Sequence, residues 1–320
     1  MKKPILLFAM ALVALTVACS KLQESPEPAG SQQEPSTNTE DFISAYTSVD
    51  DFLAKENTVK QNFNGNAESA IMLTTQAGIE ISISPMSLVD HAGNPITGSV
   101  QISIEEYSEY DAFHKDQITT ETNNNVLLES AGMFNIEVKQ AGSTLRLKDG
   151  SNYTVSFPTS DPSMKAYAGT QLPDGSVVWE EESNWLTGLD TARLRTLFSP
   201  DSFRFINCDK PIIVNDPVNH VIVLNQEDEG KDWLATLYLK ERRTACRISK
   251  QTDGSISVNP NFQLPTGEKA LITIMMVHNN LVYWYDTTIT LGDSPSLTVP
   301  KLTPITKQEF TARAQYLKNF

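Results

Sequence analysis

Residues 79–83 read IEISI, a strict alternation of apolar and polar side chains. The same alternation returns as VQISI at residues 100–104, FNIEV at 134–138 and YTVSF at 153–157. Because successive side chains of a strand point to opposite faces of a sheet, each stretch predicts a β-strand with one buried face. Turn formers such as Lys148-Asp149-Gly150 separate these stretches. Six or more such short strands favour an antiparallel sandwich or barrel.

A second β-rich region follows residues 161–205, in which residues 164–167 and 176–179 predict a hairpin around Pro173-Asp174-Gly175 and the remainder reads as irregular and partly helical. Its apolar runs include WLATLYL at residues 233–239 and ALITIMMV at 270–277. Near the end of the chain, Thr306 and Glu309 have the spacing of a capping box, which predicts the start of a helix. We expect an all-β protein of two β-sandwich modules in tandem: a first module at residues 46–160, a bridging segment at 161–205, a second β-sandwich at 206–302 and a C-terminal helix at 303–320.

The N-terminus has the features of an export signal. A basic head, Met1-Lys2-Lys3, precedes an apolar run at residues 5–15 that leads into small residues. This run is too short to span about 30 Å of hydrocarbon comfortably, so we interpret residues 1–18 as a cleaved signal peptide. The end of the segment resembles a bacterial lipobox, in which the thiol of Cys19 is acylated, although Thr16 stands where Leu is usual. An ordinary signal peptide with an incidental cysteine is the alternative.

Residues 19–45 have the composition of a flexible tether. From Ser20 to Asp41 the chain is rich in Gln, Glu, Ser, Pro and Thr, and Leu22 and Ala29 are almost its only apolar residues. Such a segment cannot bury enough apolar surface to offset its ordering entropy. A flexible tether of this length has an average reach of roughly 25–30 Å, which would hold the globular part clear of a membrane surface.

The charge of the chain excludes several classes of partner. The 320 residues contain 39 acidic and 25 basic side chains, a formal net charge of −14. This balance gives no electrostatic basis for binding nucleic acid, and it disfavours direct docking onto anionic lipid head groups. The membrane contact that we expect is therefore through the lipid on Cys19 alone.

The order of several turn and strand motifs resembles a known family. The motifs occupy residues 78–85, 88–98, 100–107, 129–134 and 145–150. Together they look like the N-terminal β-module of a large group of uncharacterised cell-surface lipoproteins of the Bacteroidota, a module that is itself similar to the ZU5 β-sandwich. The likeness covers most of residues 60–310. It implies an export route and a fold, and it implies no defined activity.

Catalytic and metal-binding patterns are absent from the sequence. There is no Gly-x-Ser-x-Gly motif, and the four histidines have none of the spacings of a zinc site. The densest acidic stretch, residues 105–111, lacks the calcium-loop pattern, so we interpret it as a solvated strand end rather than a cation site. We therefore expect no catalytic residue, no metal and no cofactor.

The two cysteines that remain after Cys19 allow two interpretations. In an oxidising compartment, Cys208 and Cys246 could form a disulfide. The alternative is two separate buried thiols, and the sequence does not give the distance between the Cα atoms that would separate these interpretations.

Three consecutive aromatic residues, Tyr283, Trp284 and Tyr285, are the candidate ligand-binding residues. In a strand, Trp284 lies on one face and both tyrosines lie on the other. One face is expected in the core, and an exposed tyrosine pair on the other would be a contact surface for a ligand such as a sugar.

These observations lead to one functional expectation. We expect a lipid-anchored protein of the outer membrane, facing the periplasm or the cell surface, that acts as a non-enzymatic binding or structural module. An envelope protein or a glycan is the expected partner, and the ligand itself is unknown. The alternative is a surface-anchored hydrolase that uses dispersed Asp and Glu carboxylates.

Overall fold

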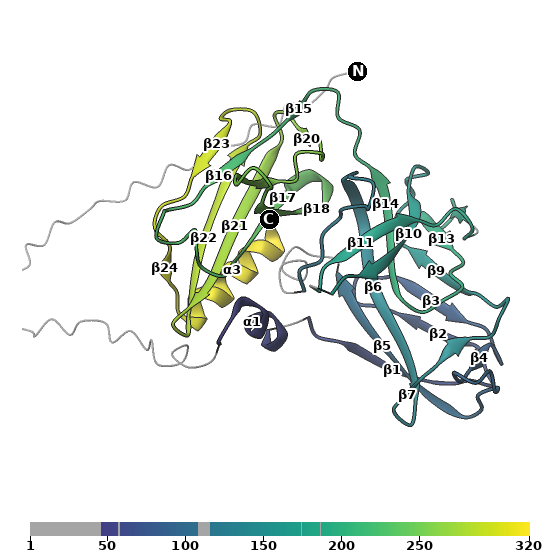
Figure 1. The fold of residues 1–320 in the computed structure, drawn as a ribbon. Helices are drawn as coiled ribbons and strands as arrows, with labels where there is room; N and C mark the ends of the chain where they lie inside the picture. The colour runs from purple at the N-terminus through teal and green to yellow at the C-terminus, as the bar shows by residue number, and fades with distance from the viewer. Residues whose placement is uncertain (1–45, 57, 108–115, 174, 186) are drawn as a thin grey trace, which may run out of the picture. The chain divides into compact units, whose positions relative to one another are not determined.

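Strands dominate the part of the chain that the computed structural model describes, which is residues 46–320 except 57, 108–115, 174 and 186. They form a seven-stranded, a five-stranded and an eight-stranded sheet and two pairs of short strands (Figure 1). Helices occupy only three short segments of this part of the chain. The prediction of an all-β protein with a short C-terminal helix is confirmed.

The seven-stranded sheet has the order β1-β5-β6-β14-β10-β11, and β7 pairs with β6. Neighbouring strands along this order are antiparallel, and so are β6 and β7. Its strands are β1 (Gln61–Asn66), β5 (Ser99–Tyr107), β6 (Leu128–Gln140), β7 (Ser143–Thr144), β10 (Lys165–Gln171), β11 (Val177–Glu181) and β14 (Phe205–Pro211).

The five-stranded sheet has the order β12-β13-β9-β3-β2 and is also antiparallel. A separate pair, β4 with β8, accompanies it. The strands are β2 (Ile71–Thr74), β3 (Glu80–Ile83), β4 (Leu88–Val89), β8 (Arg146–Leu147), β9 (Tyr153–Phe157), β12 (Thr187–Asp190) and β13 (Arg195–Phe198).

Apolar side chains from the five-stranded and seven-stranded sheets form one shared core. On β3, Ile81 and Ile83 are at most 1% exposed, and on β5 Ile102 and Ile104 are fully buried. The alternation that predicted these strands therefore places one face in the core, as expected. The other face of the five-stranded sheet is left for polar side chains.

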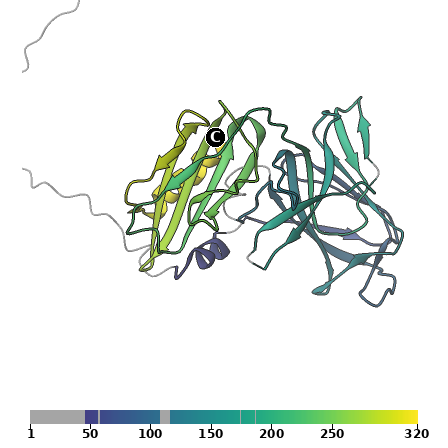
Figure 2. The same ribbon diagram turned by 45° about the horizontal axis from the view of Figure 1, so that its top comes forward.

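The third sheet, of eight strands, has the order β23-β16-β19-β18-β17-β21-β22-β24, and its long strands run side by side in Figure 2. The short pair β15 and β20 contributes Val218 and Leu264 to the core on one of its faces. The strands are β15 (Pro217–Val218), β16 (Val221–Val223), β17 (Trp233–Leu239), β18 (Thr244–Lys250), β19 (Ile256–Val258), β20 (Leu264–Pro265), β21 (Lys269–His278), β22 (Leu281–Thr290), β23 (Ser296–Thr298) and β24 (Thr303–Pro304).

Two α-helices contribute to a separate apolar cluster with this sheet. They are α1 (Val49–Lys55) and α3 (Lys307–Asn319), and a short 3₁₀ turn, η2, spans Lys240–Arg242. The ring of Phe310 on α3 lies 4.9 Å from Phe52 on α1 and 5.9 Å from Trp284 on β22, centroid to centroid. The predicted capping box is confirmed, because Thr306 Oγ1 accepts a hydrogen bond from the Glu309 backbone N–H and the Glu309 carboxylate accepts one from the Thr306 N–H.

The segment from Thr119 to Leu128 bonds to both β-rich regions. The indole N–H of Trp179 on β11 donates to the Thr119 carbonyl at 2.6 Å. The Thr120 N–H donates to the Ala245 carbonyl on β18 at 2.8 Å, and the Thr244 hydroxyl donates to the Leu128 carbonyl at 2.7 Å. These bonds connect the seven-stranded and eight-stranded sheets through one stretch of backbone.

The structure differs from the expected domain limits between residues 161 and 211. The stretch expected to bridge two modules supplies strands β10 to β13, which complete the first two sheets. The expected start of the second module at residue 206 lies inside β14, which pairs with β6 and β10. Strand β13 pairs with β9 and β14 pairs with β6, and these partners are distant in sequence, so local periodicity does not show that these strands belong to the first sheets.

Candidate ligand-binding groove

Polar and small side chains cover the outer face of the five-stranded sheet. The strand registers pair Met72 with Ser82 and Ser82 with Thr154, so these three residues form one row across β2, β3 and β9. The next row contains Thr74, Glu80, Ser156 and Leu197, which pair in the same way across four strands. Because strand neighbours alternate between faces, the apolar residues between these positions point into the core.

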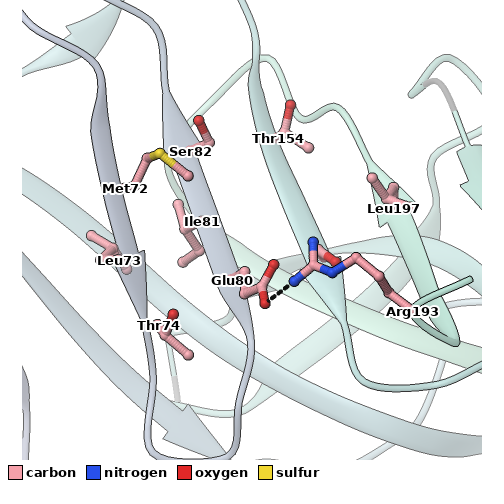
Figure 3. A pocket seen from close by; sticks show the side chains of 10 residues that line it. Met72, Leu73, Thr74, Glu80, Ile81, Ser82, Thr154, Arg193 and Leu197 are labelled. Atoms are coloured by element: carbon pink, nitrogen blue, oxygen red, sulfur yellow. Dashed lines mark hydrogen bonds and ion pairs between the residues drawn. The ribbon is translucent and has the colours of Figure 1, made fainter. Parts of the chain in front are cut away.

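These rows form the floor of a groove of about 470 Å³ (Figure 3). This volume lies in the range of small-molecule and short-peptide sites. The groove has apolar residues on strands β2 and β13 and hydroxyl groups on the strands between them. Its lining residues are Met72, Leu73, Thr74, Glu80, Ile81, Ser82, Thr154, Ser156, Arg193 and Leu197.

An ion pair crosses one side of the groove. Arg193 Nη2 bonds to Glu80 Oε1, and this pair is drawn as a dashed line in Figure 3. A second guanidinium, that of Arg195, lies with Nη1 3.8 Å from the same carboxylate oxygen. Glu80 is therefore shared by two arginines on β13 and the turn before it.

The two arginines have different surroundings. Arg195 donates from Nε to the Ser156 hydroxyl and from Nη2 to the Ser156 and Gly78 carbonyls, each at 2.6 Å, and its side chain is 11% exposed. The Arg193 side chain is 56% exposed. In the part of the chain that the structure describes, its bond to Glu80 is the one hydrogen bond that its guanidinium makes. Arg195 is thus held rigidly, and Arg193 presents most of its donors to solvent.

The turn between β12 and β13 sets the position of Arg193. The Asp190 carboxylate accepts hydrogen bonds from the backbone N–H groups of Ala192 and Arg193 at 3.1 and 3.0 Å. Leu194 then takes a positive φ of 55°, which reverses the chain into β13. This local geometry directs the Arg193 side chain over the sheet.

The chemistry of the groove is suited to binding. Glu80 is the one carboxylate among its lining residues, and it is paired with the guanidinium groups of Arg193 and Arg195. A glycosidase requires two facing carboxyl groups, and a nucleophilic hydrolase requires a base beside its nucleophile. The lining supplies hydroxyl donors and acceptors, one exposed guanidinium and two apolar contacts instead.

The aromatic residues predicted as a ligand platform contribute to the apolar cores of the eight-stranded sheet. Trp284 is 3% exposed, its ring packs against Phe310 and its indole N–H donates to the Asp286 carboxylate at 2.7 Å. Tyr283 and Tyr285 are partly buried against the core on the opposite face. The expected exposed tyrosine pair is therefore not found, because both tyrosines pack against an apolar core.

The cysteines follow the second of the two interpretations. Cys208 and Cys246 are both free and fully buried. Cys208 belongs to the core between the first two sheets, and Cys246 belongs to the core of the eight-stranded sheet. A disulfide between them is excluded by this placement, and burial raises the pKa of each thiol.

Other predicted positions lie outside the described residues or away from the groove. Cys19, the signal peptide and the tether lie before residue 46 and so outside the described residues. The last four residues of the acidic stretch, 108–111, also lie outside them. Within that stretch, Glu105 pairs with Lys60 at 2.9 Å. Buried Glu106 accepts hydrogen bonds from Gln61 and the Ala77 N–H. In the described ranges, no group of three or more His, Cys, Asp or Glu side chains could hold a metal ion.

Two carboxyl groups with raised pKa values, also away from the groove, were missed from the sequence. Glu121 accepts from the Thr119 hydroxyl at 2.9 Å and the Arg247 N–H at 3.0 Å, and burial raises its pKa to about 7. Asp209 is fully buried with Asn207 Nδ2 2.6 Å from Oδ2, and burial raises its pKa.

Sequence reasoning missed the groove residues too. The polar members of the alternating strands, Ser82 and Thr154 among them, mark a solvated face, but they do not show which solvated face is hollowed. The residue that could have pointed to the groove is Met72, an apolar side chain that the strand alternation places on the solvated face of a short edge strand.

No helix in the described part of the chain is long and apolar enough to cross a membrane. Comparison of the chain with protein-family models, with curated proteins and with solved structures finds no match in any of the three.

Proposed function

We propose that this protein is a non-enzymatic binding module of an exported, lipid-anchored envelope protein, and that the groove on the outer face of the five-stranded sheet holds its ligand. The observation that carries the proposal is the groove itself. It combines a floor of hydroxyl groups, Met72 and Leu197 on separate strands, and an exposed guanidinium at Arg193. A few directional polar groups combined with apolar contacts are the usual composition of a binding site.

The polar groups of the groove favour binding over hydrolysis. The Glu80 carboxylate is engaged with two guanidinium groups, and no second carboxyl group in the lining faces it as a glycosidase would require. The hydroxyl of Ser156 accepts from Arg195 Nε, and no histidine lines the groove to activate it. The alternative of a hydrolase with dispersed carboxylates therefore has no support from the lining.

The placement in the envelope is proposed from the N-terminal sequence. The basic head, the apolar run and Cys19 have the order of a lipoprotein signal, and the polar segment after Cys19 is suited to act as a tether. A binding module held in this way meets its partner at a membrane surface.

The test is a substitution that fills the groove. Thr154 is exposed in the middle of β9, and Thr154→Tyr would place a ring over the floor. Thr288→Tyr is the matched control, because Thr288 is also an exposed mid-strand threonine but lies on β22. The full chain is screened against arrays of synthetic peptides and of oligosaccharides, and the affinity of each hit is measured by titration calorimetry.

We expect Thr154→Tyr to weaken binding at least tenfold and Thr288→Tyr to leave it unchanged. Hits that bind both variants with equal affinity would contradict the assignment of the groove. Turnover of a bound probe by the full chain would contradict the non-enzymatic role.

A further inference from the structure

We propose that the groove selects an extended peptide with an acidic side chain between two apolar side chains, and that Arg193 is the receptor for its carboxylate. This inference rests on the proposed function and names the class of ligand. It follows from the unequal environments of the two arginines around Glu80.

Arg193 has donors to spare. A guanidinium has five N–H donors, and in the described part of the chain that of Arg193 uses Nη2 alone, in its bond to Glu80. Its 56% exposed side chain projects over the sheet from the turn before β13 (Figure 3). A ligand carboxylate can therefore bind Nε or Nη1 without displacing any protein group.

The Glu80 carboxylate has a second cationic neighbour besides Arg193. If a ligand draws Arg193 away, the Arg195 guanidinium stays close to the Glu80 carboxylate, because Ser156 and Gly78 hold it in place. A cationic ligand group could bind only the Glu80 carboxylate, and it would compete for that carboxylate with two guanidinium groups. The local charges thus favour an anionic ligand group over a cationic one.

The protein's net negative charge does not reverse this preference. At physiological ionic strength, exposed charges more than about 8 Å apart are largely screened, so the groups beside the ligand decide. Asp190, in the turn that carries Arg193, directs one carboxylate oxygen to the backbone N–H groups of Ala192 and Arg193. Its role is to position the turn.

The apolar contacts set the spacing of the ligand side chains. Met72 is 80% exposed on β2, and Leu197 is partly buried on β13, three strand intervals away. Three intervals of about 4.8 Å give roughly 14 Å across the strands, and the registers offset Leu197 from the row of Met72 by two residues, about 7 Å along them, so the two positions lie roughly 16 Å apart. In an extended peptide, side chains two residues apart share a face, and positions i−2 and i+2 lie about 13 Å apart. The flanking leucine side chains and the long side chain of Met72 can span the remaining few ångströms, so a central acidic residue flanked in this way fits the groove.

The lining favours a peptide over a sugar. Sugar sites commonly present a flat aromatic ring to the ligand, and no aromatic side chain lines this groove. The hydroxyls of Ser82 and Thr154 can each donate to and accept from a peptide backbone that crosses the sheet.

Three blocked pentapeptides test the inference: Leu-Ser-Asp-Ser-Leu, the same sequence with Asn, and the same sequence with Lys at the centre. Binding to the full chain is measured by calorimetry. We expect the Asp peptide to bind at least tenfold more tightly than the Asn peptide, since a hydrogen bond between charged groups is about twice as strong as a neutral one. The Lys peptide should bind most weakly.

Variants of the protein separate the roles of the charges. Arg193→Gln should remove the difference between the Asp and Asn peptides, and Glu80→Gln should strengthen binding of the Asp peptide by removing a competing carboxylate. Arg146→Gln is the matched control, because Arg146 is also a partly exposed arginine that pairs with an acidic neighbour, Asp149, but it lies outside the groove. It should leave all three affinities unchanged.

Each contrary result has a distinct meaning. Preference for the Lys peptide, with weaker binding in Glu80→Gln, would overturn the anionic class of ligand. A neutral oligosaccharide that Thr154→Tyr excludes and Arg193→Gln does not affect would overturn the peptide class and leave the proposed function standing. Failure of Thr154→Tyr to affect any bound probe would overturn both.

Discussion

At the scale of single residues, the space around a position decides which side chains the fold tolerates there. Gly169 on β10 has no room for a side chain, because an added Cβ would lie 2.6 Å from the Phe205 Cβ and 2.7 Å from Val177 Cγ1. Gly188 on β12 has space, since the nearest atom to its added Cβ would be the Leu197 Cβ at 3.9 Å. Neither glycine has a positive φ, so the two differ in packing alone.

This contrast gives a stability prediction. We expect Gly169→Ala to lower the free energy of unfolding by about 1–3 kcal/mol, the usual effect of overpacking. Gly188→Ala should stay within about 0.5 kcal/mol of the wild type. Urea unfolding followed by tryptophan fluorescence measures both, and equal effects would contradict the packing argument.

Glu121 leads to a prediction about pH. Burial is the main cause that raises its pKa to about 7, above the ordinary value of 4.5. A carboxyl group whose pKa is higher in the folded state than in the unfolded state contributes full stability below pH 4.5, and that stability is lost as pH rises toward 7. Glu121→Gln removes this titration.

We therefore expect the wild type to lose more stability than Glu121→Gln between pH 5 and pH 8, by a few kcal/mol at most. The relevant measurement is the difference between the two proteins at each pH, because burial also raises the pKa of Asp209 and adds to the slope of both. Parallel stability curves would show that Glu121 does not titrate in this range.

At the scale of elements, helix α3 shows how a local signal and a tertiary contact combine. The capping box marks its start, and Phe310 anchors it between Phe52 and Trp284. Tyr316 on the same helix is 46% exposed, whereas Phe310 is 4% exposed. The sequence predicted the helix and its cap, but not the partners of its apolar face.

We expect Phe310→Ala to destabilise the protein by about 3–5 kcal/mol, because it removes a buried ring and leaves a cavity. Tyr316→Ala is the control on the same helix and should cost far less. Thermal unfolding of the two variants gives the comparison. A small effect of Phe310→Ala would mean that α3 is not docked as the structure shows.

Strands were predicted well where they alternate and poorly where they do not. Strands β3, β5 and β9 show a period of two because one side faces a core and the other faces solvent. Strands β10 and β12 lack that contrast, since β10 has four successive buried residues and β12 is largely exposed. Strand β10 was still predicted in part, as one half of a hairpin with β11, whereas β12 was not predicted. The segment that contains them therefore resembled a bridge.

At the scale of the whole molecule, the proposed lipid anchor at Cys19 leads to a prediction about where the protein is found. We expect Cys19→Ala to release the protein into the soluble fraction with an unchanged melting temperature, as judged by fractionation and thermal unfolding. Persistent membrane association of the variant would count against the lipid anchor.

The two buried thiols give a separate prediction. Because Cys208 and Cys246 lie in different cores, mass spectrometry of the unreduced, denatured protein should find both alkylated. A mass lower by two hydrogens, with no alkylation at either position, would contradict the structure.

The sequence by itself determined the all-β class and the C-terminal helix with its cap. These depend on contacts between residues that are close in the chain, which periodicity and spacing report directly. Tertiary structure alone decided which strands the five strands from β10 to β14 pair with. It also decided the separation of the two thiols and the partial burial of Tyr283 and Tyr285. The groove belongs to this second group, because Met72, Glu80, Thr154 and Arg193 meet only after strands distant in sequence have paired.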